Sequence, residues 1–183
     1  ERMKSILISI KPQWCEKIFD GKKTIEVRKS APKEVPFKAY IYCTKAKKKW
    51  NLCDYEGAYQ NSEGEIVYAQ QHVVGEFICD NVDKYTYDYC DGVDIDDDTI
   101  LDTTIDREDI NIYAKGKPLY GWHISDLKIY DKPKELSEFN RPCSYAGLCF
   151  SCDRATFGGT GDVPCEKEIN RPPMSHMFVE ELK

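Results

Sequence analysis

The chain has 183 residues, of which 41% are hydrophobic and 12% aromatic, so it is long enough to bury a core and does not belong to the disordered class. Its net charge of -6 is unevenly spread. Residues 1–50 carry 14 Lys or Arg against 5 Asp or Glu, whereas residues 51–110 carry 2 against 17. The basic region is typical of a surface that attracts polyanions beside an acidic flank; pairing of the two regions with each other is the alternative.

Two features of the sequence bear on location. No apolar run approaches the roughly 18 residues of a membrane-spanning helix. The first residues, ERMKSILISI, lack the basic, apolar and small-residue regions of a signal peptide. We therefore expect a cytoplasmic protein without a membrane partner.

The first elements in chain order are a strand, a short helix and a second strand. Residues 5–10, SILISI, form a β-branched apolar run that predicts a strand. In KPQWCEKIFDG, Pro12 suits a first helical turn and Gly21 suits a helix C-terminus, while the apolar residues between them share one face. The next segment, KTIEVRK, alternates apolar and charged residues as a strand does.

The remaining patterns predict mostly strands. We expect strands at 38–44, 55–60, 65–80 and 119–133, and a helix at 106–116, with an acidic, irregular stretch at about 81–110. Gly75, inside a long strand pattern, is expected to mark a bulge or a close backbone approach. This inventory predicts a mostly β protein with short helices (α+β), and favours a small mixed β-barrel over a sandwich.

The charged strand is the first candidate site. Alternation places Ile25 and Val27 on one face and Glu26 and Arg28 on the other, with Lys23 at the start of the strand. An ionised Glu26 could accept from the exocyclic amine of cytosine, and Lys23 and Arg28 could hold a phosphate or a base carbonyl.

Each residue of this candidate site has a structural alternative. Trp14 could stack on an unpaired base or simply belong to the core. Glu26 and Arg28 could be no more than a solvated surface ion pair.

The segment ISIKPQWCEKIFDGKKTIEVRK resembles the ASCH domain, a family of PUA-like β-barrels, in its strand, helix and G-x-K-x-x-E-x-R motif. VVGEFICD and LYGWHISDLKIYDKP resemble later strands of that family. The resemblance covers residues 3–138 as an ASCH (PUA-like) domain with an acidic insertion at about 81–110. It implies a cleft at the helix-to-strand junction that binds RNA or a modified nucleoside.

A catalytic role is the alternative that the resemblance raises. Some small ASCH proteins hydrolyse the amide of 4-acetylcytidine, but Glu26 stands where those proteins have a Thr. If the chain is a hydrolase of a nucleoside or RNA, Glu26 or Glu76 would activate water and Lys23 would stabilise an oxyanion. A third hypothesis is an interaction module whose acidic stretch at 81–110 contacts a basic protein partner.

The loop KAKKKW, residues 45–50, is a second candidate for nucleic-acid contact. Lys48 and its neighbours would contact phosphates and Trp50 would stack on a base. A solvated loop is the alternative.

The region 139–183 is rich in cysteine and resembles extended, prophage-type ASCH proteins. Its spacing C-x5-C-x2-C-x12-C favours a structural zinc knuckle packed on the barrel. Free buried thiols and an iron–sulfur cluster are the alternatives, and His176 and Cys15 are substitute ligands. The four predicted zinc ligands are Cys143, Cys149, Cys152 and Cys165.

Overall fold

The structure is a computed structural model that describes residues 3–46, 56–142 and 167–182. Its larger sheet has five strands in the order β11-β6-β3-β1-β12. In this sheet β1 and β3 run parallel, and the other neighbouring strands pair antiparallel. These strands are β1 (Lys4–Ile10), β3 (Phe37–Cys43), β6 (Val73–Cys79), β11 (Ser125–Lys134) and β12 (His176–Val179).

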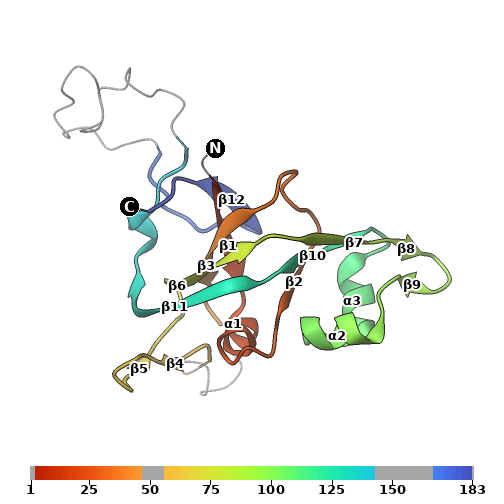
Figure 1. Cartoon of the computed structure of the whole chain (residues 1–183), viewed down its shortest axis with the longest axis horizontal. Coiled ribbons are helices and arrows are strands. Elements are labelled where there is room, and N and C mark those ends of the chain that lie inside the picture. The colour runs from red at the N-terminus through yellow and green to blue at the C-terminus, as the bar shows by residue number, and fades with distance from the viewer. Residues whose placement is uncertain (1–2, 47–55, 143–166, 183) are drawn as a thin grey trace.

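A second, antiparallel sheet has the order β2-β10-β7 and lies beside the larger one (Figure 1). Its strands are β2 (Ile25–Arg28), β10 (Leu119–His123) and β7 (Val82–Tyr85). Two short hairpins are formed by β4 (Tyr59–Gln60) with β5 (Ile66–Val67), and by β8 (Tyr87–Asp88) with β9 (Gly92–Val93). Three α-helices and one short 3₁₀ helix complete the described chain: α1 (Pro12–Phe19), α2 (Asp97–Thr103), α3 (Arg107–Ala114) and η2 (Leu136–Glu138).

The prediction of a mostly β chain with short helices is confirmed, but the closed barrel is wrong for the residues that the structure describes. The expected strand at 119–133 is two strands that meet at Ile124, and each half pairs within a different sheet. Ile124 N–H donates to Thr24 O at 2.9 Å, which holds the bend against the start of β2. Strand β2 pairs with β10 alone, so the described strands close no ring.

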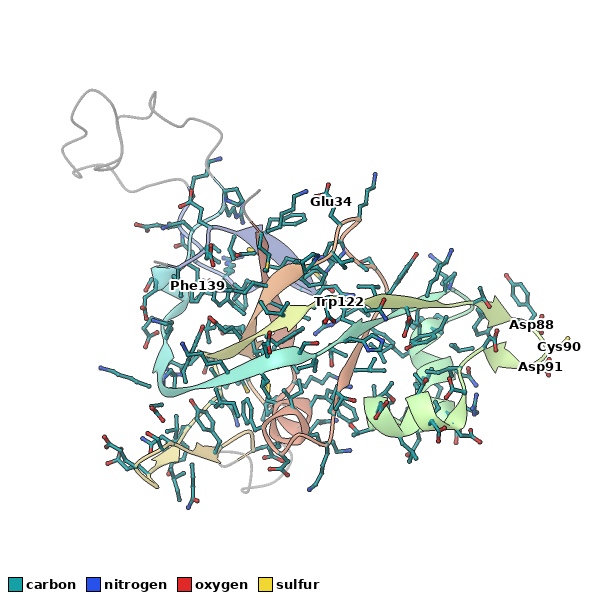
Figure 2. All side chains as sticks on the ribbon, in the orientation of Figure 1. Glu34, Asp88, Cys90, Asp91, Trp122 and Phe139 are labelled. Atoms are coloured by element: carbon teal, nitrogen blue, oxygen red, sulfur yellow. The ribbon has the colours of Figure 1, made fainter. Side chains whose placement is uncertain are left out.

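Three apolar clusters hold the elements together. The largest lies between the five-stranded sheet and α1, and includes Cys15, Ile18, Phe37 and Trp122. Figure 2 labels Trp122 in the middle of the molecule. A second cluster, on the other face of that sheet, packs β1, β3 and β6 residues against Phe139, Ile169 and Val179 from the chain beyond residue 138.

The third cluster explains why residues 81–110 are more regular than the sequence predicts. Tyr85, Val93, Ile95 and Ile110 pack on Val27 of β2, so this acidic stretch has a small core of its own. Most of its acidic residues lie at helix starts and at the exposed β8–β9 tip, where Figure 2 labels Asp88 and Asp91. The predicted helix at 106–116 is α3, which is followed by Lys115 in a left-handed conformation.

Gly75 confirms the expected close approach. A Cβ at this position would lie 2.5 Å from Lys128 O, and the ladders that β6 makes with β3 and β11 both shift register beside it. No helix among the described residues is long and apolar enough to cross a membrane.

Candidate functional site

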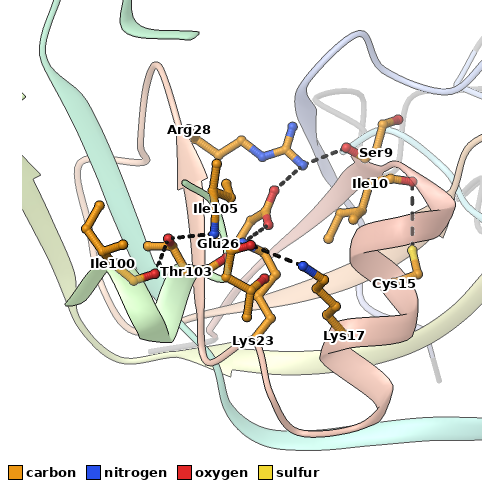
Figure 3. Close-up of polar contacts among 11 residues, drawn as sticks. Ser9, Ile10, Cys15, Lys17, Lys23, Glu26, Arg28, Ile100, Thr103 and Ile105 are labelled. Atoms are coloured by element: carbon orange, nitrogen blue, oxygen red, sulfur yellow. Dashed lines mark hydrogen bonds and ion pairs between the residues drawn. The ribbon is translucent and has the colours of Figure 1, made fainter. Parts of the chain in front are cut away.

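The predicted charged strand is β2, and its charged side chains are buried. The side chain of Lys23 is 0% exposed, that of Glu26 is 7% and that of Arg28 is 9%. Glu26 Oε2 lies 3.3 Å from Lys23 Nζ, and Glu26 Oε1 lies 2.9 Å from Arg28 Nη2, so each carboxylate oxygen receives one cation (Figure 3). The interpretation of Glu26 and Arg28 as a solvated surface pair is therefore wrong.

Helix α1 and strand β10 fix the position of the motif GKKTIEVR and so of its charged side chains. Gly21, with a φ of 69°, ends the turn after α1 and lets the chain reverse into β2. In the β2–β10 ladder, Glu26 lies opposite Trp122 and Arg28 opposite Tyr120. Directly opposite residues project to the same face of a sheet, so aromatic side chains of β10 flank the charged ones of β2.

Arg28 also connects β2 to the larger sheet. Its Nη2 donates to Ser9 O at 2.6 Å, in addition to its ion pair with Glu26. Within the described part of the chain, the buried Nε of Arg28 has no hydrogen-bond acceptor. The cluster therefore includes one buried donor that a ligand oxygen could satisfy.

Lys23 is held by the C-terminal end of α2. Its Nζ donates to Thr103 O at 2.7 Å, and the neighbouring Lys17 Nζ donates to Thr104 O at 3.2 Å. Both ammonium groups also lie over the Trp14 ring, at 5.4 Å for Lys23 and 4.9 Å for Lys17. Cations at a helix C-terminus are favourable because the last carbonyls carry partial negative charge.

The cluster has two cations for one carboxylate. Burial lowers the pKa of Lys23 from its ordinary value of 10.5, and the charge of Glu26 opposes that shift. Arg28 lowers it further, since like charges disfavour the protonated form. The arrangement therefore suits a ligand that brings negative charge or carbonyl oxygens.

An aromatic residue also borders the Arg28 side of the cluster. Lys29 Nζ lies 4.8 Å from the centroid of the Tyr113 ring, and Tyr113 is 39% exposed. Burial raises the pKa of Tyr113, and the charges of Arg28 and Glu26 both act on it. Trp14 and Tyr113 thus flank the charged group, and the exposed ring of Tyr113 could stack on a base.

Trp14 is intermediate between a base-stacking surface and a core residue, the two roles that the sequence allows. Its ring is half-buried and packs against the main core cluster, so it is not a free stacking surface. The structure brings it together with Lys23, Glu26 and Arg28.

Glu76 lies away from the Lys23–Glu26–Arg28 cluster. It lies opposite Tyr40 in the β3–β6 ladder, and Tyr130 Oη donates to its Oε2 at 2.5 Å. Tyr40 and Tyr130 belong to the second core cluster, whereas α1 and Phe77 belong to the first. Glu76 therefore lies on the face of the sheet away from α1, and the catalytic pairing of Glu76 with Lys23 has no geometric support.

Several predicted ligands lie outside the described residues, namely Lys48, Trp50 and the four cysteines at 143, 149, 152 and 165. The zinc site therefore stays a prediction of the sequence. In the described ranges, no three His, Cys, Asp or Glu side chains are grouped to hold a metal ion.

Cys15 and His176, the two substitute metal ligands, both lie against other side chains of the described chain. Cys15 is fully buried, and burial together with its neighbour Cys43 raises its pKa. The His176 ring contacts the Trp122 ring edge to face, with centroids 5.0 Å apart and an interplanar angle of 70°, and burial and the charge of Arg28 lower the pKa of His176.

A separate cavity of about 440 Å³ lies on another flank of α1. Neither Lys23 nor Arg28 lines it. The residues that line it are Glu16, Phe19, Asp20, Ala58, Tyr59, Gln60 and Ile129.

The sequence patterns did not predict some partners in the site. The acceptors Ser9 O and Thr103 O are main-chain atoms, which any residue type could supply, so no sequence signal marks them. Lys17 had a signal, because it lies one helical turn after Trp14 on α1.

Comparison with known proteins identifies the fold. No protein-family model matches the chain, and no curated protein matches it. Among solved structures, the ASCH protein from Zymomonas mobilis matches with a TM-score of 0.53 and 14% identity, over 97% of this chain and 89% of that one. The chain has the ASCH fold. Two mutant forms of the same Zymomonas mobilis protein match similarly, with TM-scores of 0.52 and 0.53, 14% identity and 97% of this chain, over 91% and 89% of theirs.

The extent of this match adds to the sequence resemblance. The resemblance rested on residues 3–138, but the structural match covers 97% of the chain. Strand β12, beyond that boundary, pairs with β1 as the edge of the five-stranded sheet. At 14% identity the likeness concerns the ASCH fold, and the chemistry of the site rests on this chain's own residues.

Proposed function

We propose that the chain is an ASCH-domain protein that binds RNA or a modified nucleoside beside the Lys23–Glu26–Arg28 cluster. The observation that carries this proposal is the buried surplus of positive charge: two cations share one carboxylate, and all three side chains are at most 9% exposed. Buried charges are costly unless they are compensated, so the cluster attracts a ligand with phosphate or carbonyl oxygens.

The flanking side chains favour a base as part of that ligand. Trp14 and Tyr113 supply aromatic surface near the cluster, and Lys29 lies over Tyr113 at its exposed border. A base stacked on aromatic surface, with its polar edge toward Arg28 and its phosphate toward Lys29, would use all three features. Glu26 would favour a base with an exocyclic amine, such as cytosine.

The test is binding of cytidine, 4-acetylcytidine and a short single-stranded RNA, measured by calorimetry for wild type, Glu26→Gln and Lys22→Ala. Lys22 is the matched control because it adjoins Lys23 but its side chain is 70% exposed. We expect Glu26→Gln to weaken nucleoside binding at least about tenfold, because the carboxylate acceptor is lost, and Lys22→Ala to leave it unchanged. Equal affinities in all three proteins, or no binding to any of the ligands, would contradict the proposal.

A hydrolase of a nucleoside amide is the second candidate, and the lowered pKa of Lys23 favours it. A lysine whose pKa is moved toward neutrality is better placed for proton transfer than an ordinary one. Incubation with 4-acetylcytidine followed by chromatography for cytidine tests this candidate. In an enzyme, Lys23→Met abolishes turnover while substrate still binds, whereas in a binding protein wild type forms no product.

A protein partner for the acidic residues 81–110 is the remaining alternative. These residues include the exposed β8–β9 tip, where Tyr89 is 89% exposed. If no nucleoside or RNA binds, this tip becomes the first surface to test.

A further inference from the structure

Three consecutive carbonyl groups at the end of α2 accept hydrogen bonds from the segment that contains the candidate site. Asp102 O accepts from Thr24 N–H at 3.0 Å, and Thr103 O accepts from Lys23 Nζ at 2.7 Å. Thr104 O accepts from Lys17 Nζ at 3.2 Å. We call residues Asp102–Thr104 the α2 end; Figure 3 shows Lys17 and Lys23 beside Thr103.

The α2 end occupies the donor that the proposed ligand would use. Lys23 Nζ points to Thr103 O as well as to Glu26, and its side chain has no exposed surface. A base carbonyl or phosphate oxygen can therefore reach this ammonium group only if the Thr103 carbonyl moves away. A carbonyl at a helix C-terminus carries partial negative charge, so it resembles the oxygen that would replace it.

The α2 end is also strained. Thr104 has a φ of 57°, in the left-handed region where a β-branched side chain crowds the following carbonyl. Glycine or asparagine is the usual residue at such a helix end. In addition, Thr104 Oγ1 is buried and has no hydrogen-bond partner in the described parts of the chain. Strain of this kind persists where the surrounding contacts impose it, and it makes the alternative, released conformation easier to reach.

We infer that the α2 end is an internal competitor for Lys23. It satisfies the lysine in the free protein, and it withdraws when a ligand oxygen takes the place of the Thr103 carbonyl. The strain at Thr104 keeps this contact weak enough to be displaced. The inference rests on the proposed function, since the competing ligand is the nucleoside proposed above.

The experiment uses two substitutions that change the α2 end in opposite directions and leave Lys23, Glu26 and Arg28 themselves unsubstituted. Lys17→Met removes the donor to Thr104 O and loosens the contact. Thr104→Gly removes both the left-handed strain and the unpaired hydroxyl, and tightens it. Lys115→Gly is the matched control, because Lys115 has a similar φ of 52° at the end of α3.

Two measurements are made on the full chain. Reductive methylation followed by peptide mass spectrometry gives the rate at which Lys23 is labelled, which reports opening of the α2 end without any ligand. Calorimetry with cytidine and 4-acetylcytidine gives affinity; nucleosides are used because they carry no phosphate that Lys17 could contact. We expect Lys17→Met to raise both labelling rate and affinity several-fold, and Thr104→Gly to lower both roughly fivefold. Lys115→Gly should match wild type in both.

The outcomes separate this inference from the proposed function. If wild type binds nucleoside but neither substitution changes affinity, competition by the α2 end is overturned while the binding function stands. If no nucleoside binds, the proposed function fails and the labelling rates decide: opposite shifts support displacement of the α2 end, and equal rates overturn it.

Discussion

Glu26→Gln should be one of the most destabilising isosteric changes in this chain. The substitution keeps the size of the side chain but removes the negative charge between Lys23 and Arg28, whose partner atoms lie 3.3 and 2.9 Å from its oxygens. Breaking a buried ion pair by removing one partner costs about 3–5 kcal/mol, because the other charge stays buried without compensation. The Gln carbonyl can still accept from one of the two cations, so we expect a loss of about 3 kcal/mol.

The pH dependence of that loss identifies its cause. Glu26 opposes the lowering of the Lys23 pKa, so the Lys23 pKa falls further in the variant. In the window between this depressed value and 10.5, the unfolded chain then binds more protons than the folded one, and stability rises with pH. The destabilisation by Glu26→Gln should therefore shrink as pH rises from the Lys23 pKa of the variant to the higher Lys23 pKa of the wild type, because over that window only the variant folds with Lys23 uncharged.

Urea unfolding followed by tryptophan fluorescence, at a series of pH values, measures both effects. Lys22→Ala is again the control: its ion pair with Asp20 has side chains 70% and 58% exposed and should contribute under about 1 kcal/mol. A loss below about 1 kcal/mol for Glu26→Gln, or one independent of pH, would refute the reasoning that the cluster is a compensated set of buried charges.

Three further predictions concern other parts of the chain. Gly75→Ala should lower the free energy of unfolding by about 1–3 kcal/mol, because its Cβ would meet Lys128 O at 2.5 Å; urea unfolding at constant m-value checks this. Among the described cysteines, exposed Cys90 should react with iodoacetamide in the native protein at about pH 8 far faster than Cys79, whose pKa burial raises to about 12; peptide mass spectrometry measures both rates. Metal analysis should find about one zinc per chain, lost in Cys149→Ser; a metal-free wild type would contradict the four-cysteine site.

Local elements were predictable where a residue has a distinctive backbone role. Pro12 at the first turn and Gly21 at a φ of 69° bound α1 where the sequence predicts it. The same local signals predicted the close approach at Gly75. Local signals could not predict whether the strands form a closed barrel or open sheets. That depends on the segment 119–134, which divides at Ile124 into two strands of different sheets.

The charged residues of the candidate site were predictable from the sequence, but the groups that surround them were not. Alternation along β2 placed Glu26 and Arg28 together, but alternation along β6 could not say that Glu76 faces away from α1. Burial was also hidden, because a strand of four residues with two charges is typical of a solvated face. The α2 end, Ser9 of β1 and Trp14 of α1 contact the charged face of β2, whereas the third apolar cluster covers the opposite face at Val27. The acidic composition of residues 81–110 conceals the apolar members of that cluster, Val93, Ile95 and Ile110.

The charge of the cluster links binding to the position of α2. Lys23, Glu26 and Arg28 together leave one positive charge, and the C-terminal end of a helix supplies a partial charge of about -0.5. The α2 end therefore compensates only part of the surplus, and a full anionic or strongly polar ligand oxygen would compensate more. Since the ligand oxygen and the Thr103 carbonyl need the same ammonium group, stronger docking of α2 must weaken ligand binding by the same free energy.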